Sequence, residues 1–312
     1  MLGITSSTAN KIPLKIKAQT LPKVGNPPVG QISDLQALSQ IKTLGDPDLS
    51  NQTWTFTFCE SAENHVGMQM IGNKAPQGFS LEDLSATQKL ADSKGLKTEL
   101  VDLYKNLPVA NQDPTLQAQV LIIREAWKLF FTEDEYKHFL QETKDSEKIV
   151  DKKAWMKGRV VNKKARYNLC YADFSQQPNY EEKKGTVVNF QDVPYLNRIR
   201  QNLGSICGQK GNNLFAEMNY YYDSNVAGIG PHGDSERRLV VGLRVGASMD
   251  LQYHWFHEGK PIGELEILNL NGGDLYIMSD KAVGQDWKKR KIPTLRHAAG
   301  AKKYTTFAEK KK

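Results

Sequence analysis

The sequence predicts an α+β protein, with a β-rich C-terminal half behind a smaller α/β module. After about residue 150 the chain is a series of short strand-like runs separated by Gly, Asn and Asp. Repeated short strands with turn signals are typical of a β-sandwich or a double-sheet jelly roll. Before that point, apolar residues at helical spacing alternate with strand-like runs, and the charged stretch DSEKIVDKKAW separates the two textures.

These textures divide the chain into three segments. Residues 1–50 are rich in Pro, Gly, Ser, Thr and Lys, so we expect a flexible arm or linker that buries too little surface to fold alone. Residues 51–150 are expected to form the small α/β module, and residues 151–312 the β-rich domain.

The module begins with a predicted strand at Thr53–Phe58, where aromatic and threonine residues alternate. Apolar spacing predicts a helix over 81–107, interrupted near Gly95. QAQVLIIREAWKLFF indicates a buried strand. Thr132, followed by three acidic residues, is typical of the start of a second helix.

The β-rich domain contains one clear helix, for which Asp192 is the predicted cap, Pro194 suits the first turn and Gly204 is the predicted end. The strand-like runs after it are FAEMNYYY, RLVVGLRVG, MDLQYHW, ELEILNL, DLYIMS and KIPTLRHAA.

Composition narrows the class of protein. Hydrophobic residues make up 39% of the chain, which suffices for a core, and no apolar run is long enough to cross a bilayer or to act as a signal peptide. The three cysteines, Cys59, Cys170 and Cys207, are scattered, which argues against a disulfide framework or a zinc ribbon and for a reducing compartment. We therefore expect an intracellular monomer, cytoplasmic or nuclear, that does not enter a membrane. The net charge of +7 makes a polyanion a plausible partner, nucleic acid first.

A candidate metal site lies in GPHGDSE, directly after the run FAEMNYYY. His232 and Asp234 are two residues apart, and such residues project from the same face of an extended chain. They can occupy adjacent positions on one metal ion, and a third ligand from a later strand would complete a facial triad that suits iron(II) and leaves positions open. His297 lies on such a strand, whereas His254 and His257 follow the pair too closely. No catalytic residue beyond the three metal ligands is predicted.

Five motifs follow one another between about Trp155 and Phe307. They are VVNKKARYNLCYAD, VPYLNRIRQNL, AEMNYYYDSNVAGIGPHGDSE, VVGLRVGASMDLQYHW and GGDLYIMS. In this order they resemble the AlkB family of nucleic-acid dealkylating oxygenases, from its substrate loop to the strand ahead of its distal histidine. The resemblance implies a double-stranded β-helix (jelly-roll) oxygenase core with iron(II) on His232, Asp234 and His297. It also implies 2-oxoglutarate and dioxygen as cosubstrates. Residues 1–150 show no such match.

The resemblance also assigns residues to 2-oxoglutarate. Asn219 and Tyr221, which share one face of a predicted strand, would contact it. AlkB-like enzymes hold its far carboxylate with an arginine on the strand after the distal histidine, but this chain has no arginine after Arg296. Two basic residues are candidates instead. Lys303 lies in GAKKYT, which resembles the Gly-x-Arg-x-Ser/Thr ending of 2-oxoglutarate oxygenases, although lysine offers only a point charge. Arg244 lies between two glycines that leave room for its side chain to turn inward.

The implied substrate is a modified base in DNA or RNA, which the enzyme would hydroxylate or demethylate. The run QDWKKRK attracts phosphates and offers an aromatic ring for stacking. Its candidate substrate-binding residues are Trp287, Lys288, Lys289 and Arg290. Further basic residues that could extend this patch are Lys163, Lys164, Arg166, Arg237 and Arg238. A base in a duplex must flip out to be reached, and the candidates for its stacking pocket are Tyr167, Tyr171, Tyr253 and Trp255.

Two other function classes stay open. The same triad serves protein hydroxylases that act on Pro or Lys side chains. A catalytically silent domain that binds nucleic acid is less favoured, because the triad is intact. For the N-terminal module we expect a role in substrate selection, and His65 either contacts substrate or caps a turn.

Overall fold

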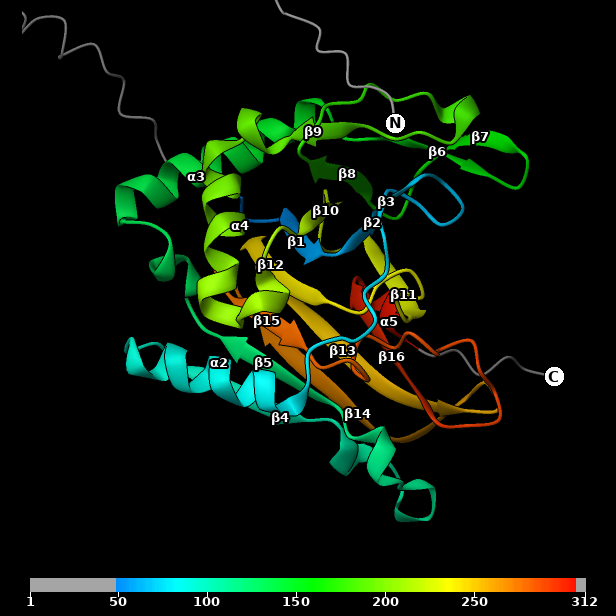
Figure 1. Cartoon of the computed structure of the whole chain (residues 1–312). Helices are drawn as coiled ribbons and strands as arrows, with labels where there is room; N and C mark the ends of the chain where they lie inside the picture. The colour runs from blue at the N-terminus through cyan, green and yellow to red at the C-terminus, as the bar shows by residue number, and fades with distance from the viewer. Residues whose placement is uncertain (1–48, 307–312) are drawn as a thin grey trace, which may run out of the picture. The chain divides into compact units, whose positions relative to one another are not determined.

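The computed structural model describes residues 49–306, and within them the chain is a mixed α+β structure dominated by one large sheet (Figure 1). The predicted arm, residues 1–50, lies outside the described residues except for its last two. Among the described helices none has the length and apolar composition of a membrane-spanning helix.

The large sheet has eight strands and is antiparallel except for its last pair. In spatial order they are β4 (Thr98–Asp102), β5 (Gln119–Ile123), β15 (Leu275–Met278), β12 (Val240–Gly246), β1 (Thr53–Cys59), β10 (Phe215–Tyr221), β8 (Tyr167–Ala172) and β9 (Val187–Asn189). The smaller sheet is wholly antiparallel and contains β11 (Gly228–His232), β16 (Thr294–Gly300), β13 (Met249–His257) and β14 (Lys260–Leu270).

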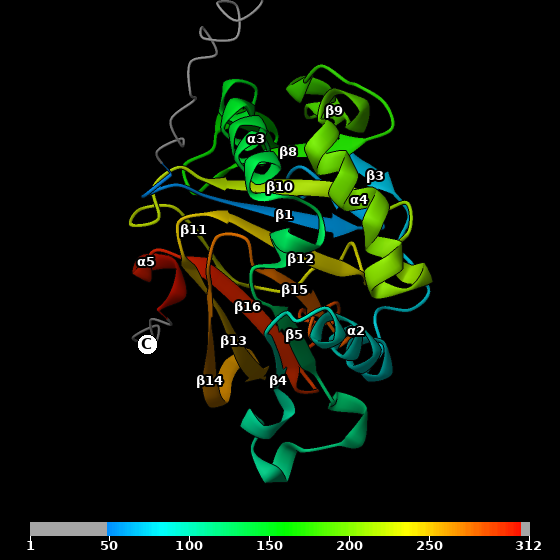
Figure 2. The same cartoon turned by 90° about the vertical axis from the view of Figure 1, so that its left-hand side faces the viewer.

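Among the described residues, two short hairpins and four α-helices complete the fold. The hairpins are β2 (Ser61–Glu63) with β3 (Met70–Gly72), and β6 (Lys153–Met156) with β7 (Arg159–Asn162). The helices are α2 (Leu81–Ser93), α3 (Glu133–Asp145), α4 (Pro194–Cys207) and α5 (Lys302–Thr305). Helices α2, α3 and α4 cover one side of the large sheet, and the smaller sheet lies on its other side (Figure 2).

Strand β1 confirms the prediction from its alternating residues and explains why they alternate. Trp54, Phe56 and Phe58 point into the apolar core under the helices, where Phe56 packs against Phe139 of α3. The intervening threonines point to the opposite side, and Thr55 and Thr57 reach a cavity there. All seven residues of the strand are buried because both faces of the sheet are covered.

The predicted boundary near residue 150 is wrong as a structural boundary. Strand β1 lies between β10 and β12 and pairs with both along its length. Strand β5 likewise pairs with β15. The described residues form one compact unit, because strands from both halves of the chain alternate in a single sheet and share its core.

The helices agree with prediction at α3 and differ at α2 and α4. The helix predicted over 81–107 ends at Ser93, and residues 98–102 form strand β4, which pairs with β5 at the edge of the large sheet. Thr132 and Glu135 form the capping box that starts α3. Helix α4 follows Val193, not Asp192, and Glu142 of α3 accepts its first free N–H groups. The helix also continues through Gly204 to Cys207. Gly204 therefore does not end the helix but leaves room for the close approach of Asn212.

Candidate metal centre

A cavity of about 650 Å³ has walls from both sheets, from the β2–β3 hairpin and from residues 287–288. Strand alternation decides which side chains enter it. On β10, Glu217, Asn219 and Tyr221 line the cavity, while the residues between them pack into the core under the helices. Arg244 of β12 reaches the cavity by the same rule.

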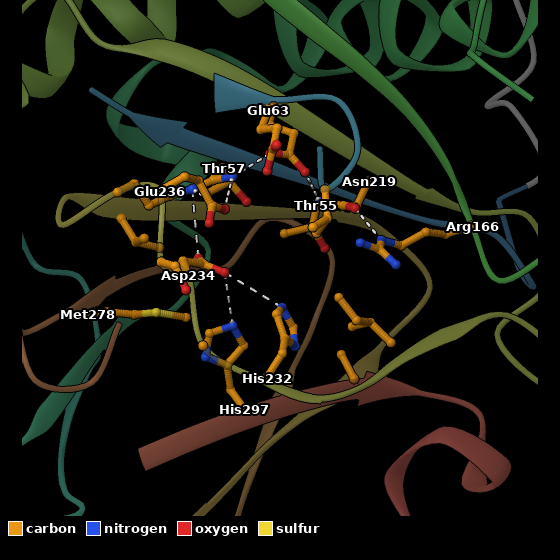
Figure 3. A pocket seen from close by; sticks show the side chains of 18 of the residues that line it. Thr55, Thr57, Glu63, Arg166, Asn219, His232, Asp234, Glu236, Met278 and His297 are labelled. Carbon is orange, nitrogen blue, oxygen red and sulfur yellow. Dashed lines mark hydrogen bonds and ion pairs between the residues drawn. The ribbon is translucent and has the colours of Figure 1, made fainter. Parts of the chain in front are cut away.

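The structure brings His232, Asp234 and His297 together in this cavity, as predicted. The ligand atoms of the three side chains lie within 4.8 Å of one another. The Nε2 atoms of His232 and His297 are 3.6 Å and 3.7 Å from Oδ1 of Asp234. Figure 3 shows the three side chains pointing toward one another, with Glu63 on the opposite wall.

Local backbone geometry places these ligands. His232 and His297 are register partners on the antiparallel pair β11–β16, and a register shift between Ile229 and His232 lets both of these β11 residues face the cavity. Strand β11 ends at His232, so Asp234 lies in the following turn and not on the strand. Gly233 permits this turn: a Cβ there would meet Gly284 O at 2.1 Å.

Burial sets the protonation of the three side chains. It lowers the pKa of His232 to about 4 and that of His297 well below its usual value, so both rings are neutral near pH 7. Nδ1 of His232 donates to Gly230 O at 2.9 Å, which leaves the Nε2 lone pair free. Burial raises the pKa of the Asp234 carboxyl to about 7, and Arg237 opposes that shift. A bound cation would favour the ionised carboxylate.

A buried arginine organises the carboxylates beside the triad. Nη2 of Arg237 donates to Glu217 Oε2 at 2.5 Å and to Glu236 Oε1 at 2.8 Å, and its Nε lies 3.8 Å from Asp234 Oδ2. Only 3% of Arg237 is exposed. One guanidinium therefore serves three carboxylates, including the oxygen of Asp234 that faces away from the histidines.

The predicted cosubstrate residues Asn219 and Tyr221 both line the cavity. The Asn219 carbonyl oxygen accepts from Arg166 Nε at 2.5 Å and from Asn168 Nδ2 at 2.8 Å, and its amide donates to Glu217. The Asn219 side chain is thus held in one orientation by three neighbours.

The two candidates for a far-carboxylate anchor differ sharply. Arg244 is 1% exposed and lines the cavity, and its Nε has no hydrogen-bond partner in the described part of the chain. Lys303 is exposed on α5 and is not among the residues that line the cavity. Lys303 therefore does not reach the cavity, because the chain after β16 turns into the helix α5 and does not continue as a strand. The expected free space beside Gly242 is also absent, since the Tyr276 ring fills it.

The predicted stacking aromatics Tyr253 and Trp255 are core residues. Each is 1% exposed, and neither lines the cavity. Strand β13 runs between β14 and β16, so one of its faces is packed into the core between the sheets. The Trp255 indole donates to Leu103 O at 2.8 Å, and Tyr253 packs against the ring of His297. Tyr171 is likewise buried, and Tyr167 stacks on Tyr222.

Only part of the run of residues 287–290 lies at the cavity. Trp287 and Lys288 line the cavity, and the Trp287 indole donates to Ser235 Oγ at 2.9 Å. Lys289 and Arg290 are exposed and lie outside the cavity lining. The expected extension of this patch fails at Lys163 and Arg237, which are buried, and at Arg238, which pairs with Asp280.

Several cavity residues were not predicted, because they come from the N-terminal part of the chain or from a loop. Thr55 and Thr57 project from β1, and Glu63 and Asn64 from the β2–β3 hairpin. Arg166, which was predicted only as part of the basic patch, enters the cavity just before β8. The threonines could have been found from the polar face of their strand. The positions of the other residues at the cavity depend on the order of strands in the sheets, which the sequence does not reveal. His65 lines the cavity as well.

Comparison with known proteins gives a match over most of the chain. The chain is 47% identical over 253 residues to "Uncharacterized protein R156" of Acanthamoeba polyphaga mimivirus. The match covers 81% of this chain and 97% of the viral protein. No known protein-family profile matches the sequence.

Proposed function

This chain belongs to the family of that mimivirus protein, and from the geometry of its cavity we propose that it is an iron(II)- and 2-oxoglutarate-dependent oxygenase similar to the AlkB family. One observation carries the proposal. The same cavity holds two histidines and a carboxylate that converge on one point, and a buried arginine, Arg244, which has no carboxylate within 4.0 Å among residues 49–306.

The donor set fits iron(II). Two neutral imidazoles and one carboxylate form a facial triad, which occupies one side of the metal and leaves positions for a chelating cosubstrate and dioxygen. His232 Nε2, His297 Nε2 and Asp234 Oδ1 would be the ligands. Arg237 would hold the second oxygen of Asp234 and so keep the carboxylate in one orientation.

Strand pairing supports a jelly-roll core. In a jelly roll an antiparallel ribbon of eight strands is wrapped so that strand one pairs with eight, two with seven, three with six and four with five. The pairs β10–β1, β11–β16, β12–β15 and β13–β14 follow this order. Strand β1 would then fill the eighth position from the N-terminal side. That would explain why the described part of the chain has no further strand after β16, and why no arginine follows Arg296 in the sequence.

The bound iron and 2-oxoglutarate would supply oxidative decarboxylation coupled to hydroxylation of a substrate C–H bond. The chain's own residues bind and orient. Arg244 would pair with the far carboxylate, and its burial strengthens that pairing because little water competes. Asn219 and Tyr221 form the neighbouring wall. Covered sheet faces exclude water from this end of the cavity.

For the substrate we propose a modified base in DNA or RNA. Trp287 offers an aromatic face at the cavity, and its indole N–H is anchored on Ser235. Lys288 lines the cavity beside it, while exposed Lys289 and Arg290 are available to phosphates. A protein hydroxylase acting on lysine is the second candidate. The Glu63 carboxyl favours it, since it lines the cavity and no basic group lies within 4.0 Å of it among residues 49–306.

Anaerobic titration with iron(II) and 2-oxoglutarate tests the proposal. We expect a weak visible charge-transfer band that requires both components, and its loss in His232→Ala. His138→Ala removes an exposed histidine on α3 and is the matched control, which should keep the band. Absence of the band in the unmodified protein would contradict the oxygenase assignment.

Succinate release then separates the substrates. Stimulation by methylated oligonucleotides supports a nucleic-acid substrate, and the accompanying binding should weaken steeply as salt is raised. Stimulation by lysine-containing peptides, and by no oligonucleotide, would replace that substrate with a protein.

A further inference from the structure

The guanidinium of Arg244 has a single side-chain partner among the residues described. Its Nη1 donates to Thr55 Oγ1 at 2.7 Å. Thr55 and Arg244 are register partners on the antiparallel pair β1–β12, so their side chains leave the sheet side by side on the cavity face. The backbone of Arg244 is fixed separately, through its N–H to Asp274 O and its carbonyl to the N–H of Gly273.

Arg244 is costly to bury as the structure stands. The residue is 1% exposed, and in the described chain no carboxylate oxygen lies within 4.0 Å of its guanidinium. Its Nε is buried without a hydrogen-bond partner. A buried charge normally has a counter-ion. An anionic ligand in the cavity would supply it, and a carboxylate matches the planar fork of arginine.

We propose that Thr55 is a positioning residue, whose hydroxyl orients the Arg244 guanidinium toward the far carboxylate of an oxo-dicarboxylic acid bound at the metal centre. The inference rests on the proposed function and deepens it. The hydroxyl accepts from one Nη and so limits rotation of the guanidinium, while the rest of the guanidinium remains available to an acid in the cavity that Arg244 lines. The N-terminal strand would then be part of the cosubstrate site, although the resemblance to oxygenases covers only residues 155–307.

The test compares 2-oxoglutarate with pyruvate, which has the same oxo-acid head but no far carboxylate. Binding of each acid is measured anaerobically on the metal-loaded full chain, without turnover. Wild-type protein should prefer 2-oxoglutarate. Thr55→Val should weaken the binding of 2-oxoglutarate about tenfold, which corresponds to about 1.4 kcal/mol. It should leave the binding of pyruvate unchanged. Thr55→Ser retains the hydroxyl and should restore the preference.

Thr53→Val is the matched control for stability. Thr53 lies on the same strand, is also buried, and donates to Ala247 O at 2.9 Å, but it does not line the cavity. It should lower the melting temperature as much as Thr55→Val while keeping the preference for 2-oxoglutarate.

Two results would overturn the inference, and they are distinguishable. If wild-type protein discriminates between the acids and Thr55→Val does so equally well, Thr55 does not position Arg244 and the oxygenase assignment stands. If the metal-loaded wild-type protein binds neither acid, the proposed function fails together with the inference.

Discussion

Replacing Arg237 by Met should lower the free energy of unfolding by about 3–5 kcal/mol, the usual cost of removing one partner from a buried ion pair. Arg237 is 3% exposed and Glu217, its closest partner, is 5% exposed. Without the guanidinium, Glu217 and Glu236 lose their cation in a place that water hardly reaches. The methionine keeps the apolar volume, so the lost charge pairing dominates the effect.

Urea denaturation at pH 7, followed by circular dichroism, measures this loss. Arg238→Met is the control at the neighbouring position: Arg238 pairs with Asp280, but both side chains are partly exposed, so about 1 kcal/mol or less is expected. Adding Glu217→Gln to Arg237→Met should recover part of the loss, because it removes one uncompensated charge. Equal losses for Arg237→Met and Arg238→Met would refute the account of this cluster.

Three further predictions concern other parts of the molecule. Thr132→Ala removes half of the capping box of α3 and should cost about 1 kcal/mol in urea denaturation, whereas Thr132→Ser should be nearly neutral. The thiols of Cys59, Cys170 and Cys207 are buried, and burial raises the pKa of Cys59 and Cys207 to about 12. A thiol reagent at pH 8 should therefore label none of the three until urea is added. Rapid labelling of the native protein would contradict this prediction. Burial lowers the pKa of Lys163 from 10.5 to about 8. Between these two pH values the unfolded chain binds more protons than the folded chain, so the free energy of unfolding should rise with pH, by up to about 3 kcal/mol. Lys163→Met should abolish the rise, and an unchanged pH profile in that variant would show that another group is responsible.

Local patterns in the sequence predicted local structure well. The alternation of residues in β1 and the capping box of α3 each depend on neighbours within a few positions, and the structure confirms both. The convergence of His232, Asp234 and His297 was predictable because the pair is local and, among the later histidines, His254 and His257 follow it too closely. That they bind iron remains a prediction.

Side chains that depend on distant partners were not predictable in the same way. Residues 53–58 carry no signal for being inserted between β10 and β12, since register partners more than 150 positions apart decide it. The same pairing places Arg244 against Thr55 on the cavity face.

The sequence by itself determined local elements such as strand β1 and helix α3, and that a His-x-Asp pair and a later histidine are available as metal ligands. Periodicity and capping are properties of adjacent residues, so one chain suffices to read them. Only the tertiary structure decided that strands from both ends of the described chain share one sheet, and which polar side chains their common face directs into the cavity. Which strands pair depends on the relative position of distant segments and on the burial of both faces of the sheet. Neither property is encoded within a single run of residues.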